Sequence, residues 1–161
     1  MDVLARLLLR FILVPLGAAA ALLAAAAVIL IAHRNALIAV LDADPQAQQD
    51  YFIALLFGGP LLAVLLSISA FYMLVPAAIG VLISEALAIR SWLFHAANGG
   101  LSAWLGWALT QDIRDEYHFL AEPRILIAAG LLAGLAYWIV SGWTAGFWKP
   151  IRSPPRPAPS S

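Results

Sequence analysis

Cysteine is missing from the chain. This excludes disulfides, thiol catalysis, thiolate-bound iron–sulfur clusters and covalently attached c-type haem. Charged residues are also scarce: they make up 11% of the 161 residues, with nine Lys and Arg against nine Asp and Glu. A neutral chain carries no electrostatic signature of nucleic-acid binding, so we expect no nucleic-acid partner.

Recognisable catalytic motifs are absent too. The chain has no glycine-rich phosphate loop, no Gly-x-Ser-x-Gly nucleophile elbow and no His-Glu-x-x-His metal motif. What it has in abundance is apolar side chains, at 63% of all residues. A soluble domain is roughly half apolar and a quarter charged. We therefore expect the lipid bilayer to be the solvent for much of this chain, and we expect no cofactor.

The first apolar run covers residues 11–32, between Arg10 and the pair His33-Arg34. Its length is close to the roughly 20 residues that cross a bilayer. A cleaved signal peptide is the alternative, because Arg6 and Arg10 precede the run. The apolar region of a signal peptide is shorter, at about 7–15 residues, so we interpret this run as a retained transmembrane helix.

The second apolar region, residues 52–110, is too long for one crossing and leaves no room for turns between three. It therefore predicts two. Asp44-Pro45 has the pattern of an N-cap followed by a first-turn proline, and Pro123 can begin a last span. The prediction is an all-α membrane protein, a bundle of four transmembrane helices within residues 1–146, with spans at about 11–32, 55–84, 91–109 and 125–145.

Orientation follows from the basic residues, which accumulate on the cytoplasmic side of membrane proteins. Four spans place most of them on one side: Arg6, Arg10, Arg90, Lys149, Arg152 and Arg156. We therefore expect a bacterial inner-membrane protein with both termini in the cytoplasm. Residues 147–161, rich in Pro, Ser and basic side chains, are predicted to form a disordered cytoplasmic tail.

Residues 52–110 can be divided into spans in three alternative ways. The second helix either covers residues 52–75 and ends at Pro76, leaving 77–89 along the interface, or starts near Pro60 and runs to about Ser84 with a kink at Pro76. In both cases Arg90 marks a cytoplasmic turn. A crossing at 77–97 would instead bury Glu85 and Arg90, each at a cost of about 2.5–3.5 kcal/mol, so the turn is favoured.

Three polar residues stand out in this apolar half: Glu85, Arg90 and His95. Ionisable groups inside a membrane suggest a functional site, and Glu85 with His95 could pass protons. On one straight helix, however, Glu85 and Arg90 would project about 140° apart. The simpler interpretation makes Glu85 and Arg90 solvated flanks of a turn, with His95 hydrogen-bonded one turn inside. A helix-to-helix ion pair is the other alternative.

Metal and haem sites are weakly indicated. Asp112, Asp115, Glu116 and His118 share one loop, yet their spacing matches no metal motif, so we interpret them as an acidic exterior loop. His33 and His95 belong at opposite faces of the membrane and could not share one haem iron. His118 could pair with His33 only at the exposed outer surface.

Small residues recur at spacing four in the last span, as Gly130-x-x-x-Gly134 and Gly142-x-x-x-Gly146. Such patterns let helix backbones approach closely. We expect these glycines to be helix-packing residues, either within the chain or against a second copy or another membrane protein.

Two segments resemble small uncharacterised multi-pass inner-membrane proteins of alphaproteobacteria: residues 76–91, PAAIGVLISEALAIRS, and 133–146, AGLAYWIVSGWTAG. This chain has Trp143 where those proteins tend to have a basic residue. The resemblance implies a location and a helix count, with no activity attached. The sequence thus favours a non-enzymatic structural or accessory protein that packs with itself or with a membrane complex. The alternative is a small transporter or channel subunit that uses Glu85 and His95.

Overall fold

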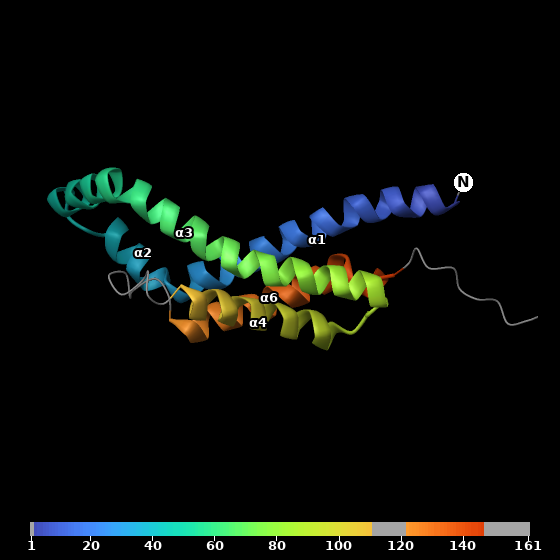
Figure 1. Cartoon of the computed structure of the whole chain (residues 1–161). Helices are drawn as coiled ribbons and strands as arrows, with labels where there is room; N and C mark the ends of the chain where they lie inside the picture. The colour runs from blue at the N-terminus through green and yellow to red at the C-terminus, as the bar shows by residue number, and fades with distance from the viewer. Residues whose placement is uncertain (1, 111–121, 147–161) are drawn as a thin grey trace, which may run out of the picture.

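The computed structural model describes residues 2–110 and 122–146, with side chains from Leu8 onward, and these residues contain helices and no strand. The acidic loop with Asp112, Asp115, Glu116 and His118, and the tail 147–161, lie outside the described residues. In chain order the elements are α1 (Asp2–Ala32), α2 (Arg34–Leu41), α3 (Pro45–Leu87), α4 (Trp92–Leu109), α6 (Pro123–Val140) and the 3-10 turn η2 (Gly142–Thr144) (Figure 1).

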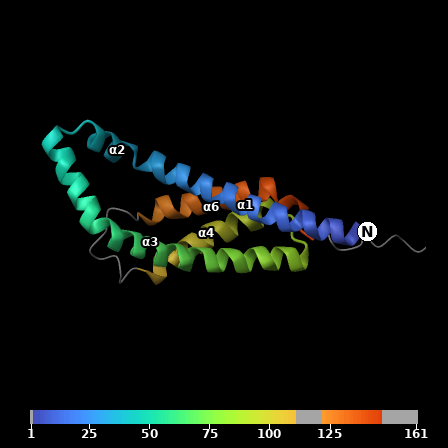
Figure 2. The same cartoon turned by 90° about the horizontal axis from the view of Figure 1, so that it is seen from above.

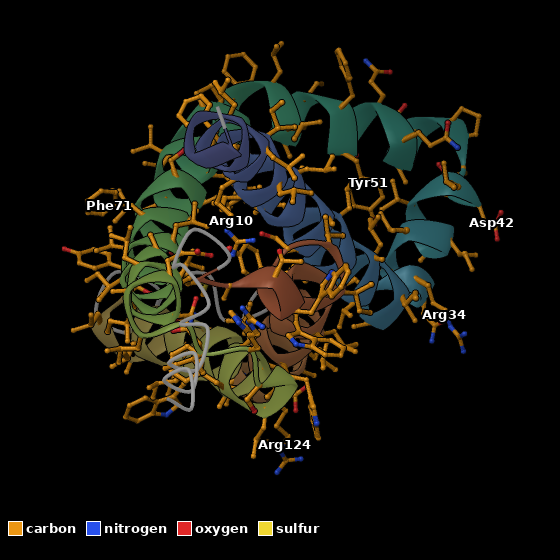
Figure 3. All side chains as sticks on the ribbon, turned by 90° about the vertical axis from the view of Figure 1, so that its right-hand side faces the viewer. Arg10, Arg34, Asp42, Tyr51, Phe71 and Arg124 are labelled. Atoms are coloured by element: carbon orange, nitrogen blue, oxygen red, sulfur yellow. The ribbon has the colours of Figure 1, made fainter. Side chains whose placement is uncertain are left out.

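The long helices pack in the order α1, α6, α4, α3, and no comparable packing joins α1 directly to α3. Each neighbour runs antiparallel to the next. Figure 3 shows this arrangement end-on, with Arg10 pointing inward among the helices. We call this end of the bundle, where α1 and α4 begin and α3 and α6 end, the polar end. The side between α1 and α3 is the open side.

Glycines set the closest approach between α4 and α6. A Cβ atom at Gly130 would overlap the carbonyl of Gly99, and one at Gly134 would overlap the carbonyl of His95. Gly142 faces the His95 ring, and Gly146 (φ +70°) faces Ala88. All four glycines singled out in the sequence therefore lie against other parts of this same chain.

Helix α3 is one continuous helix of 43 residues that passes through Pro60 and Pro76. Its predicted cap is confirmed, because Asp44 accepts a hydrogen bond of 2.9 Å from the Ala47 N–H. The alternative in which the helix ends at Pro76 is wrong. Figure 2 shows α3 bending sharply where its colour passes from turquoise to green, in the part of the helix that contains Gly58, Gly59 and Pro60. Proline and adjacent glycines are common causes of such bends.

The turn between α3 and α4 falls at residues 88–91, beside Arg90. Ala88 is left-handed (φ 57°, ψ 40°), and the Ile89 N–H donates to the Ser84 carbonyl at 2.8 Å. This is the bonding pattern of a Schellman cap, which ends a helix sharply. A single helix across residues 77–97 is therefore wrong.

Two further differences concern helix boundaries. The stretch after His33, which lies between the predicted spans 11–32 and 55–84, forms a helix of its own, α2. The last long helix ends at Val140 and is followed by the 3-10 turn, whereas the prediction ran to residue 145.

Three helices are long and apolar enough to cross a membrane: α1 from Leu8, α3 and α6. Helix α4 has the same length as α6, but His95, Asn98 and its tryptophans reduce its hydropathy.

Candidate polar site at one end of the bundle

Six polar side chains gather at the polar end, from every long helix of the bundle. We call them the polar end cluster: Arg10 of α1, Glu85 of α3, His95 of α4, Tyr137 of α6, and Ser141 and Thr144 just after α6. His95, Tyr137 and Ser141 are buried, and the Arg10 and Glu85 side chains are only 11% and 18% exposed. In a chain with so few charges, this is the principal concentration of polar groups in the described interior.

Arg10 is the centre of the cluster. One Nη forms an ion pair with a Glu85 carboxylate oxygen. The other donates to the Ser141 carbonyl at 2.9 Å and to the Thr144 hydroxyl at 2.6 Å. The last carbonyls of a helix have no partner within it, and the planar, forked guanidinium can reach several acceptors at once. Arg10 therefore ties the start of α1 to the chain that follows α6.

Glu85 completes the connection from the other side. Its second carboxylate oxygen accepts a hydrogen bond of 3.3 Å from the Gly146 N–H. Glu85 is therefore not a solvated flank of the turn. It forms the alternative that the sequence left open, an ion pair between two helices. Sequence reasoning assigned Arg10 only a flanking role. The available signal was that a lone acid in an apolar run needs a counter-charge, and that Arg10 was predicted on the same side of the membrane.

His95 lies 1% exposed in a close-fitting environment. Its Nε2 is 3.3 Å from the Ile89 carbonyl, which agrees with the predicted hydrogen bond one turn inside. The imidazole packs edge-on against Phe94, with ring centroids 5.5 Å apart, and at a tilt against Tyr137, at 5.4 Å. Gly142 leaves the room for this ring, because a Cβ there would lie 2.8 Å from Nε2.

Arg90 does not join Glu85 and His95. It is exposed at the turn, where its Nε donates to the Ala145 carbonyl at 3.0 Å and its own carbonyl accepts from the Trp138 indole at 2.8 Å. These bonds hold the α3–α4 turn against the end of α6. Of the three residues singled out in the sequence, the structure brings Glu85 and His95 into one cluster and places Arg90 at its edge.

Four buried polar atoms in the cluster have no hydrogen-bond partner among the described residues: Arg10 Nε, His95 Nδ1, Tyr137 Oη and Ser141 Oγ. Arg10 interacts electrostatically with both Tyr137 and His95. Buried polar groups are nearly always bonded in folded proteins, so such a set calls for an explanation, such as a bound water or an exchanging proton.

In the described part of the chain, no three His, Asp or Glu side chains come together as candidate metal ligands. His33 lies near the far end of α1, with Nδ1 2.9 Å from the Ile29 carbonyl, well away from His95. Comparison of the chain with protein-family models, with curated proteins and with solved structures finds no match.

Proposed function

We propose that this chain is a four-span protein of a bacterial inner membrane, with both termini in the cytoplasm, that serves as a non-enzymatic accessory component. Helix α4 is the fourth span. It lies between α3 and α6, antiparallel to both, and its 18 residues have the same length as α6. A rise of about 1.5 Å per residue gives each of them about 27 Å, close to the thickness of a bilayer core.

The observation that carries this proposal is how the polar end cluster uses its charges. Arg10 and Glu85 join three helices through one ion pair and through bonds to Ser141, Thr144 and Gly146. Charged groups placed in this way hold helix ends together. We therefore assign the cluster a structural role, which is to stabilise the packing of the helices at this end of the bundle.

A partner would bind at the open side. The predicted packing glycines are occupied by α4 and by neighbouring parts of the chain, so they offer no surface for association. Helices α1 and α3 pack directly on only one neighbour each among the long helices, α6 and α4 respectively. Their outward faces carry large apolar side chains such as Leu23 and Leu82, which are 72% and 68% exposed.

The test is photo-crosslinking in cells at native expression level, followed by mass spectrometry. Benzoylphenylalanine replaces the exposed Leu23 of α1 or Leu82 of α3, the two helices that flank the open side, and Leu101 of α4 or Leu132 of α6 serves as the matched exposed control. We expect a stoichiometric membrane-protein adduct from the first pair and none from the second. A chain that yields no adduct at any position and purifies as a lone monomer would contradict the accessory role.

A second candidate is a small transporter or channel subunit. It is favoured by one observation: the unpartnered atoms of His95, Tyr137 and Ser141 lie in the same buried cluster as Glu85. Flux of protons and monovalent cations in proteoliposomes tests it. If the cluster carries the flux, Glu85→Gln abolishes it and Arg90→Gln, at the exposed turn, does not. Flux unaffected by Glu85→Gln removes Glu85 from any such mechanism.

A further inference from the structure

Helix α3 is far longer than the helices beside it. Met73 lies against Gly106, about one turn before α4 ends, so the part of α3 that precedes about Ser69 extends past the end of α4. No charged residue occurs in α3 from Tyr51 to Ser84. At about 1.5 Å per residue this stretch measures about 50 Å, against a hydrocarbon core of about 30 Å.

At the end of the bundle opposite the polar end, where α1 ends and α6 begins, charged residues mark the level at which the bundle meets water. Gly17 of α1 lies against Tyr137 and Ser141 of α6, and because the two helices are antiparallel, Ala32 is level with the start of α6. Arg34, Glu122 and Arg124 are exposed at that level, and Figure 3 shows Arg34 and Arg124 pointing outward. If α3 continued straight beyond the level of these charged residues, its apolar first part would be exposed to water.

The bend removes this conflict. Figures 2 and 3 show that the first part of α3 runs across the long axis of the bundle instead of along it, and that α2 leads into it from α1. We call this segment, α2 with residues 42–59, the outer arm. Its bend lies in the part of α3 that contains Gly58, Gly59 and Pro60, and Gly58 has no neighbouring atom within 4 Å of a Cβ position. No side-chain contact therefore requires glycine at Gly58.

Between its tip and the bend, at residues 51–57, the outer arm is apolar on every side. Tyr51 to Phe57 contains no polar residue other than the tyrosine, and at 100° per residue these side chains point in all directions. Phe52, Leu55 and Phe57 are 65%, 63% and 78% exposed. A helix that docks on a protein has one apolar face and one polar face, whereas a helix that is apolar all round is submerged. The polar residues of the arm lie outside this stretch: Arg34 and Asn35 begin α2, and the others are grouped at the tip, as Asp42, Asp44, Gln46, Gln48, Gln49 and Asp50.

From these observations we infer that the outer arm binds lipid: it lies in the outer leaflet, parallel to the membrane surface, with its polar tip among the headgroups. Tyr51 stands at the change from polar to apolar, the position where amphipathic rings prefer the interface. This inference rests on the proposed four-span arrangement. It adds a lipid-binding element on the side opposite the polar end cluster.

Spin-label depth measurements test it, and the absence of cysteine makes single labels straightforward. Cysteine replaces Ile53 or Phe57 in the arm, Asp42 at the tip and Leu23 in the middle of α1, all exposed positions. The full-length chain is placed in phosphatidylethanolamine–phosphatidylglycerol vesicles, and collision with oxygen and with a nickel chelate is compared. We expect the two arm labels about 5–10 Å below the phosphates, with several-fold less nickel collision than the Asp42 label.

Two outcomes overturn the lipid assignment. Nickel collision equal to that at Asp42 would place the arm in water, and low collision with both reagents would mean that protein, such as a second copy, covers it. The Leu23 label separates failure of the arm from failure of the topology. A shallow Leu23 label would contradict the four-span arrangement itself, whereas a deep one leaves that arrangement standing when the arm labels disagree.

Discussion

At the scale of single residues, the molecule depends on two charges that are each buried only because the other is present. Arg10 and Glu85 are mostly shielded and share an ion pair. Desolvating both ions is costly, so such a pair adds little net stability over an apolar pair of similar size, yet removal of one member leaves the other uncompensated. A buried ion pair of this kind is recognised when each single substitution lowers the free energy of unfolding more than the double substitution does.

We expect Glu85→Gln, or Arg10→Met, to destabilise the bundle by about 3 kcal/mol, because one buried charge is left unpaired. The double variant Arg10→Met with Glu85→Met should be more stable than either single variant. Thermal unfolding in detergent, followed by circular dichroism, measures this. Arg90→Met is the control and should cost about 1 kcal/mol, since it removes one hydrogen bond at an exposed turn. Additive losses in the double variant would refute the coupling.

Sequence reasoning at this scale found Glu85 and His95 but missed their setting. His95 was correctly expected to be hydrogen-bonded inside the bundle. Glu85 was assigned to solvent, because helical periodicity describes the direction of a side chain on its own helix and says nothing about which helix will be opposite. Arg10 lies far away in sequence, and a single chain offers no signal that pairs the two beyond opposite charge.

At the scale of elements, backbone contact between α4 and α6 holds the centre of the bundle. Small residues allow this approach where lipid removes the hydrophobic drive between helices. Asn98 of α4 adds a hydrogen bond of 3.1 Å to the Ala77 carbonyl of α3, and Gly80 makes room for the Asn98 amide. The α3–α4 contact therefore combines glycine with one half-buried polar side chain.

Gly134→Ala should separate α4 from α6, because the added methyl would overlap the His95 carbonyl, which belongs to rigid helix backbone. Overpacking of this kind costs about 1–3 kcal/mol. The matched control is Gly58→Ala, where open space surrounds the new methyl and the helix propensity of alanine favours it. Melting temperatures in detergent should fall for the first and be unchanged or slightly higher for the second. Equal effects would mean that the contact is not rigid.

The elements themselves were only partly predictable. Apolar runs located α1, α3, α4 and α6, and the cap at Asp44 was correct, because hydrophobic length and N-cap chemistry are local properties. The bounds of α3 could not be predicted, since Pro76 is compatible with both a helix end and a kink when neighbouring helices satisfy the freed backbone. Helix α2 was not predicted, because its apolar stretch is short and is preceded by polar residues at positions 33–35.

At the scale of the whole molecule, the first described residues and the end of α6 lie at the same end of the bundle (Figure 1). An even number of crossings requires this, and it agrees with the basic residues that sequence analysis placed on one side. The proposed orientation, with both termini in the cytoplasm, rests on this unequal distribution of basic residues between the two sides.

Reporter fusions check the orientation. Alkaline phosphatase fused after Asp50 should be active, because it needs the exterior, and fused after Arg90 or Ser161 it should be inactive. Fluorescent-protein fusions at the same sites should show the reverse pattern. An active phosphatase after Arg90 would overturn the cytoplasmic turn, and with it the four-span arrangement.

The bonds of Arg10 also bear on the order of assembly. Arg10 and Glu85 belong to helices that are synthesised early, whereas Ser141, Thr144 and Gly146 follow the last described helix, α6. Until α6 has been inserted, one arm of the guanidinium and one oxygen of the carboxylate lack their acceptor and donor. A nascent or truncated chain without α6 therefore has the Arg10–Glu85 ion pair without the hydrogen bonds that surround it in the complete bundle, so the pair is fully bonded only after the last described helix has packed.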